Sequence, residues 1–254
     1  MTSIEWDEVQ SATGEGVRVL VVDSGVEASH PALQAPRAPG GDAEIACWTV
    51  AGADTDSPSV VKDSEGDVFG HGTAVAALIH QFAPAAGLDS LRVLGANNRG
   101  SSKAVVAGMR WGIEQEYDIV NCSFGTGRRE HIPAYKRVVD LAFCRNVWLV
   151  SACNNQNFRT EEYPAFFPAV ISVNYGALPG LVLERRRGCL VEFVARGVQV
   201  RVAWKGGGYR TITGSSFAAP HVSALAARIR QLRPGWNVCQ AKAALYRLAS
   251  KPPE

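Results

Sequence analysis

Near its N-terminus the chain reads Val17-Arg18-Val19-Leu20-Val21-Val22-Asp23-Ser24-Gly25, an apolar run followed by a polar turn. A short run that is apolar at nearly every position, with many β-branched residues, is typical of a strand buried on both faces of a parallel sheet. The pattern therefore predicts a strand over residues 17–22. Similar runs predict further strands over residues 90–94, 117–122, 147–152 and 169–173.

Longer segments with apolar residues three and four positions apart alternate with these runs and predict helices. They cover residues 72–81, 102–115, 132–144, 216–231 and 238–248. This alternation predicts an α/β protein with three α/β/α layers, in which helices cover both faces of a mostly parallel central sheet. Residues 35–67 are rich in Gly, Pro, Asp and Ser, so we expect a long surface loop with one strand over residues 45–50. We find no repeat or low-complexity linker and assign residues 1–254 to a single domain.

The composition limits the classes of partner. The 254 residues are long enough to bury a large core, 46% of them are apolar, and 26 Lys and Arg against 24 Asp and Glu leave a net charge of +2. These values argue against a disordered chain and against a nucleic-acid binder driven by bulk charge. The basic run over residues 185–187 lacks interleaved aromatic residues, and we interpret it as an exposed loop. No nucleic-acid partner is expected.

The cysteines and the N-terminus predict a cellular compartment. Six cysteines are spaced irregularly, without the CxxC pairs of a zinc site or the density of a disulfide scaffold. We expect free, buried thiols in a reducing compartment. The chain begins without a signal peptide and contains no run of 18 apolar residues. We therefore predict a cytoplasmic protein without membrane contact; an export segment removed beforehand is the alternative.

Three short motifs fall where the predicted strands end or helices begin, which is where sites lie in open parallel sheets. They are Asp23-Ser24-Gly25, Gly70-His71-Gly72-Thr73 and Gly214-Ser215-Ser216-Phe217. Alone, an Asp before Gly is a common turn and a Ser at a helix start is a common cap. Together they have a chemical logic, because a serine hydroxyl needs a base to take its proton and an acid to orient that base.

On these motifs, in the order Asp, His, Ser, the chain resembles the subtilisin-like serine proteases. The resemblance extends from about residue 16 to about residue 247 and includes residues 93–96, 120–125 and 163–173. It implies a subtilisin-like fold and a serine endopeptidase that works through an acyl-enzyme without any cofactor. It also implies that Ser216 is the nucleophile, His71 the general base, and Asp23 the residue that orients the imidazole.

The resemblance further implies an asparagine that donates a hydrogen bond to the oxyanion. We predict Asn154, which follows Cys153 where relatives usually have Gly-Asn; Asn155 and Asn157 are nearby alternatives. Because Cys153 replaces a glycine, its side chain either crowds the site or points inward. A catalytic role for this thiol is the least favoured reading.

Relatives bind an extended protein or peptide substrate against exposed backbone edges. The matching edges here are Ser123-Phe124-Gly125 and Asn98-Arg99-Gly100. Glu162 aligns with a small residue at the floor of the S1 pocket, where a carboxylate would favour Lys or Arg at P1. Neutralisation by Arg159, or solvation of the carboxylate, is the alternative.

Two features of relatives are missing. The stretch from His71 to Ala86 leaves no room for the calcium loop that relatives often carry there, so we expect no calcium at that place and assign no metal ligand. The acidic residues of 54–56 and 63–67 lack EF-hand spacing and are interpreted as a solvated loop. We expect no prodomain before the domain, as in a mature fragment or in an intracellular processing protease that folds unaided.

Two other functions compete with the endopeptidase. A peptide ligase or macrocyclase would pass the acyl group to an amine, and an insertion that shields the site from water would favour it. A catalytically weak peptide-binding module would keep the fold, and loss of a triad member would favour it. The sequence has neither feature, so endopeptidase is the preferred reading. The oligomeric state is left open.

Overall fold

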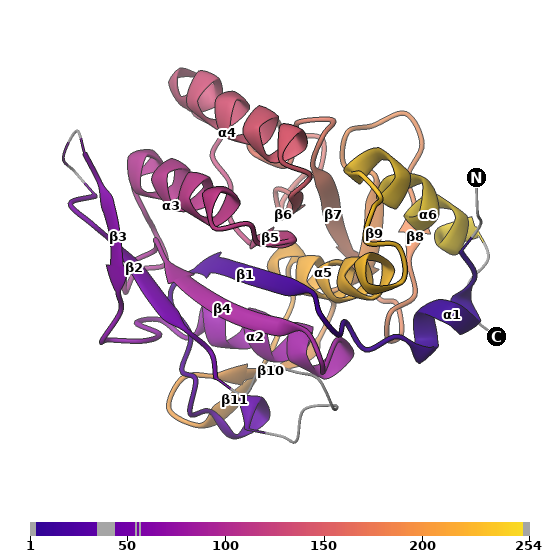
Figure 1. Ribbon diagram of the computed structural model, residues 1–254, viewed down its shortest axis with the longest axis horizontal. Coiled ribbons are helices and arrows are strands. Elements are labelled where there is room, and N and C mark those ends of the chain that lie inside the picture. Colours follow the sequence, from indigo (N-terminus) through magenta and orange to yellow (C-terminus); the bar gives the residue numbers. More distant parts are fainter. Residues whose placement is uncertain (1–3, 35–43, 54, 56, 251–254) are drawn as a thin grey trace.

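A nine-stranded sheet runs through the centre of the computed structural model, which describes residues 4–34, 44–53, 55 and 57–250 (Figure 1). Within these residues the strand order is β3-β2-β4-β1-β5-β6-β7-β9-β8. All strands from β2 to β9 in this order are parallel, and β3 and β8 pair antiparallel at the two edges. The mostly parallel sheet is therefore confirmed. The strands are β1 (Arg18–Asp23), β2 (Cys47–Ala51), β3 (Ser59–Lys62), β4 (Gly87–Arg92), β5 (Ile119–Cys122), β6 (Trp148–Ala152), β7 (Ile171–Gly176), β8 (Glu184–Arg185) and β9 (Phe193–Arg196).

Helices cover both faces of this sheet and complete the three layers (Figure 1). Strand β1 shows why, because alternate side chains of a strand point to opposite faces. Val19 and Val21 pack in the core with α2 and α5, whereas Leu20 and Val22 pack with α3 and α4. The helices are α1 (Trp6–Ser11), α2 (His71–Phe82), α3 (Ser102–Glu114), α4 (Ile132–Cys144), α5 (Ser215–Leu232) and α6 (Val238–Ser250), with short 3₁₀ turns at Pro31–Leu33 and Arg129–His131.

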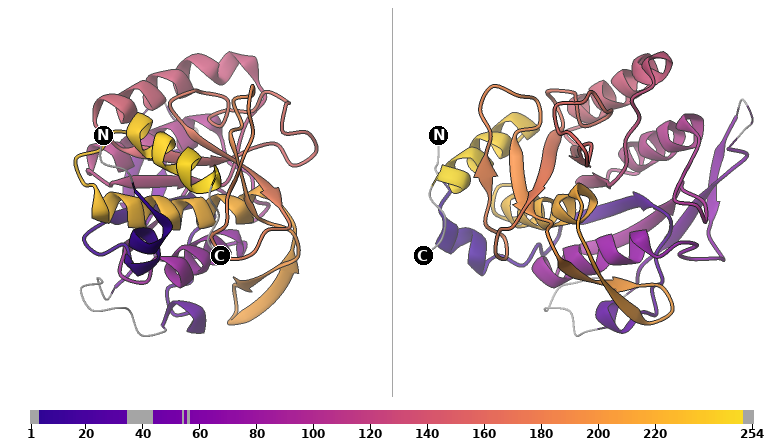
Figure 2. Two further views of the ribbon diagram at one scale, coloured as in Figure 1. Left: turned by 90° about the vertical axis from the view of Figure 1, so that its right-hand side faces the viewer. Right: turned by 180° about the vertical axis from the view of Figure 1, so that it is seen from behind.

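A separate hairpin of β10 (Val200–Trp204) and β11 (Gly208–Ile212) packs against α2 (Figure 2). Val202 and Trp204 of the hairpin form a small core with Ala74 and Leu78 of α2. Because the sheet and α5 also contact α2, nearly all of this helix is buried. The start of α2 is thereby held from several sides.

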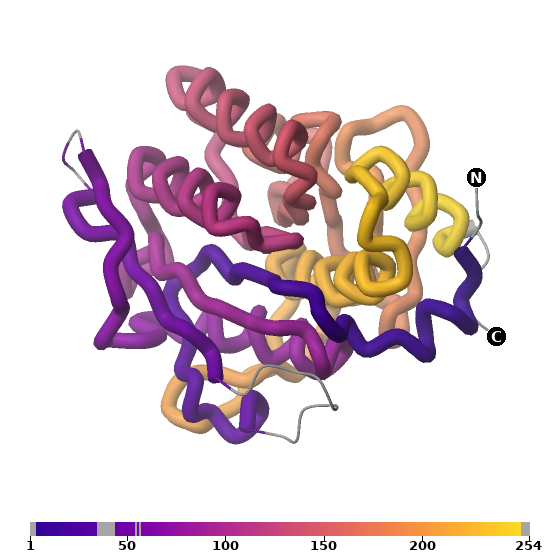
Figure 3. Tube along the Cα trace, viewed as in Figure 1, coloured from indigo at the N-terminus to yellow at the C-terminus, as the bar shows by residue number. Residues whose placement is uncertain are grey.

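The first and last helices lie beside each other (Figure 3). The indole Nε1 of Trp6 in α1 donates to the carbonyl oxygen of Leu248 in α6 over 3.0 Å. In the same region the guanidinium of Arg233, just after α5, donates to the carboxylate of Glu8 over 2.9 Å. Segments from opposite ends of the chain thus cover the same edge of the core.

The predicted helices are confirmed with small changes at their ends, but two of the strand predictions are wrong in detail. The strand predicted over residues 90–94 instead covers Gly87–Arg92. Its first half was not predicted, because Asp89 and Ser90 interrupt the apolar pattern there. The loop predicted over residues 35–67 carries the paired strands β2 and β3 instead of one strand. Residues 35–43, 54 and 56 of that loop lie outside the described residues.

The cysteines and the helix lengths test two further expectations. All six cysteines are unpaired, but only Cys122 and Cys153 are buried, so the expectation of buried thiols is wrong for the other four. Across the described residues, each helix is too short or too polar to cross a bilayer.

Candidate active site

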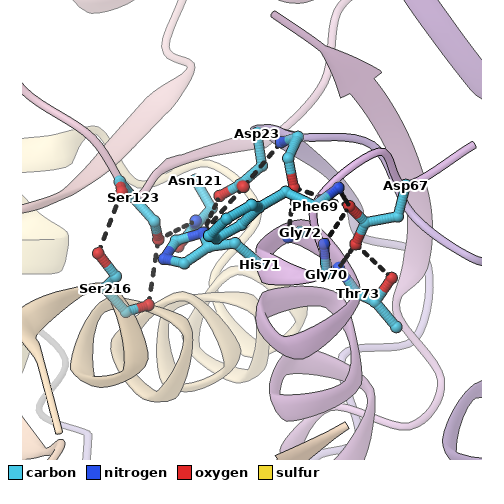
Figure 4. A network of polar contacts seen from close by, with 11 residues as sticks. Asp23, Asp67, Phe69, Gly70, His71, Gly72, Thr73, Asn121, Ser123 and Ser216 are labelled. Atoms are coloured by element: carbon cyan, nitrogen blue, oxygen red, sulfur yellow. Dashed lines mark hydrogen bonds and ion pairs between the residues drawn. The ribbon is translucent and has the colours of Figure 1, made fainter. Parts of the chain in front are cut away.

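Asp23 and His71 form a buried pair where β1 ends and α2 begins (Figure 4). The His71 Nδ1 atom lies 2.9 Å and 3.0 Å from the two carboxylate oxygens of Asp23. Asp23 is 0% exposed, and the backbone N–H of Ser24 donates to its Oδ1 over 2.7 Å. An imidazole held in this way carries its proton on Nδ1 and leaves Nε2 free to accept one.

Asp23 and His71 lie close together because the backbone at the start of α2 packs tightly against the backbone that follows β1. A side chain on Gly72 would place its Cβ 2.0 Å from the carbonyl oxygen of Gly25 and 3.2 Å from the Cβ of Asp23. Only glycine therefore fits at this point between β1 and α2. This explains why a glycine follows the histidine in the second motif.

Asp67 fastens the start of α2 to the end of β1. Its Oδ1 accepts from the hydroxyl of Ser24 (2.8 Å) and from the N–H groups of Phe69 (2.9 Å) and Gly70 (2.6 Å). Its Oδ2 accepts from the N–H (2.9 Å) and the hydroxyl (2.6 Å) of Thr73. A carboxylate near a helix start is favoured by the orphan N–H groups and the helix dipole. Sequence analysis missed this residue.

The interpretation of residues 63–67 as a solvated loop is wrong for two carboxylates. Asp67 is only 8% exposed. The side chain of Asp63 is 1% exposed and pairs with the guanidinium of Arg92, with N–O distances of 2.8 Å and 2.9 Å. Both carboxylates therefore form hydrogen bonds inside the fold and are not solvated.

Ser216 lies in the first turn of α5, and its position depends on a proline one turn later. Pro220 has no N–H, so the carbonyl oxygen of Ser216 lacks its helical partner. The hydroxyl of Ser123 donates to this oxygen over 3.2 Å and accepts from Nδ2 of Asn121 over 2.9 Å. Ser223, further along α5, donates to Oδ1 of Asn121 over 2.9 Å. The first turn of α5 is thus fixed against the end of β5.

The hydroxyl of Ser216 donates to the carbonyl oxygen of Ser123 over 3.1 Å in this structure, rather than to His71. Figure 4 shows the His71 ring between Asp23 on one side and Ser123 and Ser216 on the other. The ring also packs against Phe217, next to Ser216, with ring centroids 5.3 Å apart. A turn about one side-chain bond of Ser216 redirects its hydroxyl, and hydroxyl rotors are soft.

The charge of Asp23 controls the basicity of His71. Burial lowers the pKa of His71, because an imidazolium is poorly solvated there. The negative charge and hydrogen bond of Asp23, helped by Asp67, outweigh burial and raise the pKa above its ordinary value. His71 is therefore a stronger base than a free imidazole.

The two neighbouring asparagines after β6 have different partners. Oδ1 of Asn154 accepts from the N–H groups of Gln156 (2.9 Å) and Asn157 (3.0 Å), so Asn154 closes a local turn. Oδ1 of Asn155 instead accepts from the N–H (2.7 Å) and hydroxyl (3.0 Å) of Ser215. The amide of Asn155 therefore lies against the start of α5, beside Ser216.

A cleft of about 430 Å³ holds Ser216 together with both asparagines and Glu162. Nδ2 of Asn154 lies 3.5 Å from Oε1 of Glu162. Burial raises the pKa of Glu162, and the Asn154 contact only partly offsets this. Arg159 makes no ion pair with Glu162 in the described residues, and its guanidinium faces the ring of Phe158.

The two predicted substrate edges line the same cleft. Asn98 from one edge and Ser123, Phe124 and Gly125 from the other contribute to its walls. Thr126, next to Gly125, exchanges two backbone hydrogen bonds of 2.9 Å with Tyr163. The backbone groups of Phe124, Gly125 and Gly100 make no hydrogen bond within the described residues, so they are free to pair with a peptide. Arg99 and Gly100 lie beside the cleft in an adjoining hollow.

Cys153 points inward, one of the two placements expected for it. Its Sγ lies 3.4 Å from Oδ1 of Asn174, and burial, with the charge of Glu162, raises its pKa to about 12. The thiol is therefore protonated at neutral pH and is a poor nucleophile.

Comparison of the sequence with known proteins identifies one family. A model of the subtilase family matches residues 14–253. Subtilisin E from Bacillus subtilis (strain 168) is 30% identical over 251 residues, covering 92% of this chain and 60% of that protein. Subtilisin from Bacillus pumilus is 30% identical over 251 residues, covering 92% and 83%. The chain thus spans 60% of the length of subtilisin E.

A solved structure has the same fold. The crystal structure of a cold adapted subtilisin-like serine proteinase superimposes with a TM-score of 0.75 at 26% identity, covering 95% of this chain and 85% of that one. Sphericase superimposes with a TM-score of 0.74 at 25% identity, covering 94% and 84%. The subtilisin-like fold expected from the motifs is confirmed.

Proposed function

Because the chain belongs to the subtilase family, we propose that it is a serine endopeptidase that cleaves peptide bonds through an acyl-enzyme. The observation that carries this proposal is the buried His71–Asp23 pair beside the hydroxyl of Ser216. In this proposal Ser216 is the nucleophile, His71 the base and then the acid, and Asp23 the group that fixes the imidazole tautomer.

The reaction follows from these roles. Oγ of Ser216 attacks the carbonyl carbon of the substrate, and Nε2 of His71 takes the hydroxyl proton. The tetrahedral intermediate then collapses, the C–N bond breaks, and the leaving amine takes the proton from His71. Water attacks the acyl-enzyme in the same way, with His71 again as the base. The charge of Asp23 stabilises the imidazolium that forms in both steps.

For the oxyanion we assign Nδ2 of Asn155, together with the backbone N–H of Ser216, in place of the predicted Asn154. This assignment is supported by the different hydrogen-bond partners of the two side-chain amides. Asn155 reaches Ser215 at the start of α5, whereas Asn154 is occupied by its own turn and by Glu162. With its Oδ1 bound to Ser215, Asn155 can direct Nδ2 only away from that contact and toward the cleft it lines.

We further propose that the substrate lies extended along the edges formed by residues 98–100 and 123–125. The unpaired backbone groups on those edges support this. So does Oδ1 of Asn98, which is buried without a hydrogen-bond partner in the described residues and which a donor would satisfy. The P1 side chain then enters the cleft toward Glu162.

Glu162 makes a basic P1 residue the favoured one. A side chain on Gly125 would place its Cβ 2.5 Å from Cγ of Glu162, so Gly125 leaves room for the carboxylate to approach this edge. No basic group in the described residues pairs with Glu162. A Lys or Arg side chain of the substrate would supply the missing charge.

Cleavage after Arg is therefore expected to depend on Glu162. Glu162→Gln should lower kcat/KM for a peptide with Arg at P1 by roughly 10- to 100-fold, the worth of a hydrogen bond to a charged group. The same change should leave a Leu peptide nearly unaffected. Because the pKa of Glu162 is raised, the preference for Arg should fade as the pH drops through that pKa. Fluorogenic peptides that differ only at P1 measure both effects.

The neighbouring Glu161 provides a matched control, since it is exposed and its carboxylate accepts a hydrogen bond, within the described part of the chain, from the hydroxyl of Tyr163 alone. Glu161→Gln should leave the P1 preference unchanged. Cleavage by the unmodified protein after Leu or Phe that equals cleavage after Arg would rule out the role of Glu162.

A fluorophosphonate probe tests the proposed activity directly, because it reacts with serine hydroxyls that a base activates. We expect mass spectrometry to find the label on the peptide that contains Ser216, and we expect labelling to stop all cleavage of a peptide library. Ser216→Ala should take up no label. A folded protein that neither takes up label nor cleaves any peptide would contradict the proposal. Joined or cyclised products in the same spectra would reveal a ligase.

We also keep the prediction of a reducing compartment such as the cytoplasm. Its support is the six unpaired cysteines, two of which, Cys144 and Cys239, are exposed. Exposed thiols persist in a reducing environment and tend to be oxidised outside it.

A further inference from the structure

A second hollow opens beside the catalytic cleft, between the start of α3 and the start of α4. Its volume is about 540 Å³. We call it the basic groove, and the residues that define it are Arg99, Ser102, Lys103, Arg128, His131 and Tyr135.

The basic groove is continuous with the cleft. The two share part of their walls, namely Leu94, Asn98, Phe124 and Gly125. A peptide that lies along these edges with its P1 residue near Glu162 therefore extends into the groove. Since an extended chain advances about 3.3 Å per residue, residues a few positions before P1 reach it.

The positive charge of the groove comes from two arginines. Arg99 and Arg128 are exposed, and neither guanidinium has an ion pair within the described residues. No Asp or Glu is among the described residues that line the groove.

Two helix ends add to this field. Helix α3 begins at Ser102, where Ser101 caps the N–H of Ala104 over 3.1 Å, and α4 begins directly after His131. Each helix is 13 residues long. The N-terminal end of a helix carries partial positive charge, so both helices favour an anion in the groove.

We infer that the basic groove is a specificity subsite for an acidic residue, Asp or Glu, that precedes the P1 residue of the same peptide substrate. This inference rests on the proposed endopeptidase function. The preferred substrate then carries two charges: a carboxylate upstream of the scissile bond and a Lys or Arg at P1.

A peptide is a better occupant than a nucleic acid. The groove leads into the cleft between backbone edges that offer both N–H donors and carbonyl acceptors. A peptide pairs with both kinds of group, whereas a phosphate backbone offers acceptors alone. The net charge of the whole chain is only +2, so the positive field is local to this groove.

Peptides with Arg at P1 and Glu, Gln or Lys at one of the four preceding positions test the inference. We expect Glu to be favoured over Lys in kcat/KM by about tenfold or more at one or more of these positions, because like charges repel and opposite charges attract. The preference should shrink in 0.5 M NaCl, since the arginines are exposed to solvent. Arg128→Glu should reverse the preference at that position.

Arg145 provides the matched control, since it is exposed at the far end of α4, about 20 Å along the helix axis from its start. Arg145→Glu makes the same change of charge there and should leave the preference intact. If Arg145→Glu and Arg128→Glu act alike, the effect comes from total charge and the groove has no specific role.

Binding separates failure of the groove from failure of the endopeptidase. Ser216→Ala keeps the groove but not the nucleophile, and fluorescence anisotropy of labelled peptides measures affinity without cleavage. Tighter binding of the Glu peptide, lost in the Ser216→Ala, Arg128→Glu double variant, would support the groove even if no peptide is ever cleaved. Equal binding and equal cleavage of Glu and Lys peptides would overturn it. The inference would also be overturned if an oligonucleotide displaced the labelled Glu peptide and an unlabelled acidic peptide did not.

Discussion

Asp23→Asn should lower kcat/KM by roughly 10⁴-fold near neutral pH, as when another serine protease loses the acid of its triad. Asparagine can donate to Nδ1 of His71, which places the imidazole proton on the wrong nitrogen. It also removes the negative charge that stabilises the imidazolium. Steady-state hydrolysis of one fluorogenic peptide at several pH values measures the loss.

The pH profile gives a second readout for the same change. Activity needs neutral His71, so kcat/KM falls as the pH drops through the pKa of this residue in the free enzyme. In the unmodified protein that pKa lies above the ordinary 6.5 because Asp23 raises it. In Asp23→Asn the burial that lowers the pKa is no longer opposed by this charge, so the acidic limb should move to lower pH.

Asp140 offers a control for this experiment. It is exposed on α4 and pairs with Lys136 over 2.5 Å at the surface. Asp140→Asn should retain full activity and an unchanged profile. An Asp23→Asn protein within tenfold of full activity would show that Asp23 does not orient the base.

Asn155→Ala should lower kcat by roughly 10²- to 10³-fold with little change in KM, the cost of removing one oxyanion donor in subtilisin. The effect falls on kcat because the donor binds charge that develops only in the transition state. Asn155→Asp refines the test: it keeps an acceptor for Ser215 but replaces the N–H donor with an oxygen. It should therefore be as inactive as Asn155→Ala.

Asn154 is the comparison that decides between the two residues. Asn154→Ala removes the acceptor of a local turn and the contact with Glu162, so we expect a change mainly in P1 preference and stability. A loss of kcat larger in Asn154→Ala than in Asn155→Ala would restore Asn154 as the donor and overturn our assignment.

The sequence carried enough information for the sheet and for the family. In β1 the apolar residues are consecutive because both faces of the strand are covered, and this alone indicated a parallel sheet with helices on either side. The three motifs were recognisable because each lies where a buried strand ends or a helix begins. The family match over residues 14–253 confirmed the resemblance. The roles of Asp23, His71 and Ser216 stay proposals until the variants are measured.

What the sequence did not reveal depends on contacts between distant segments. Asp67 receives hydrogen bonds from its own loop, but also from Ser24, 43 positions away, and no local pattern distinguishes it from a solvated aspartate. The choice between Asn154 and Asn155 depends on which amide reaches Ser215, 60 residues later. The hairpin β10–β11, by contrast, had a visible signal in Gly206-Gly207-Gly208 between two β-branched runs, and it was overlooked.

The place of the serine in the chain has a consequence for biosynthesis. Asp23 and His71 belong to the first third of the sequence, but α5 follows eleven strands and four helices of the described chain and carries Ser216 and the proline that shapes its first turn. A ribosome releases the chain from its N-terminus at about 5–20 residues per second. For most of that time the emerging polypeptide holds an aspartate and a histidine with nothing to activate. On the proposed roles, the nascent protein therefore has no peptidase activity until α5 has emerged and docked against the end of β5.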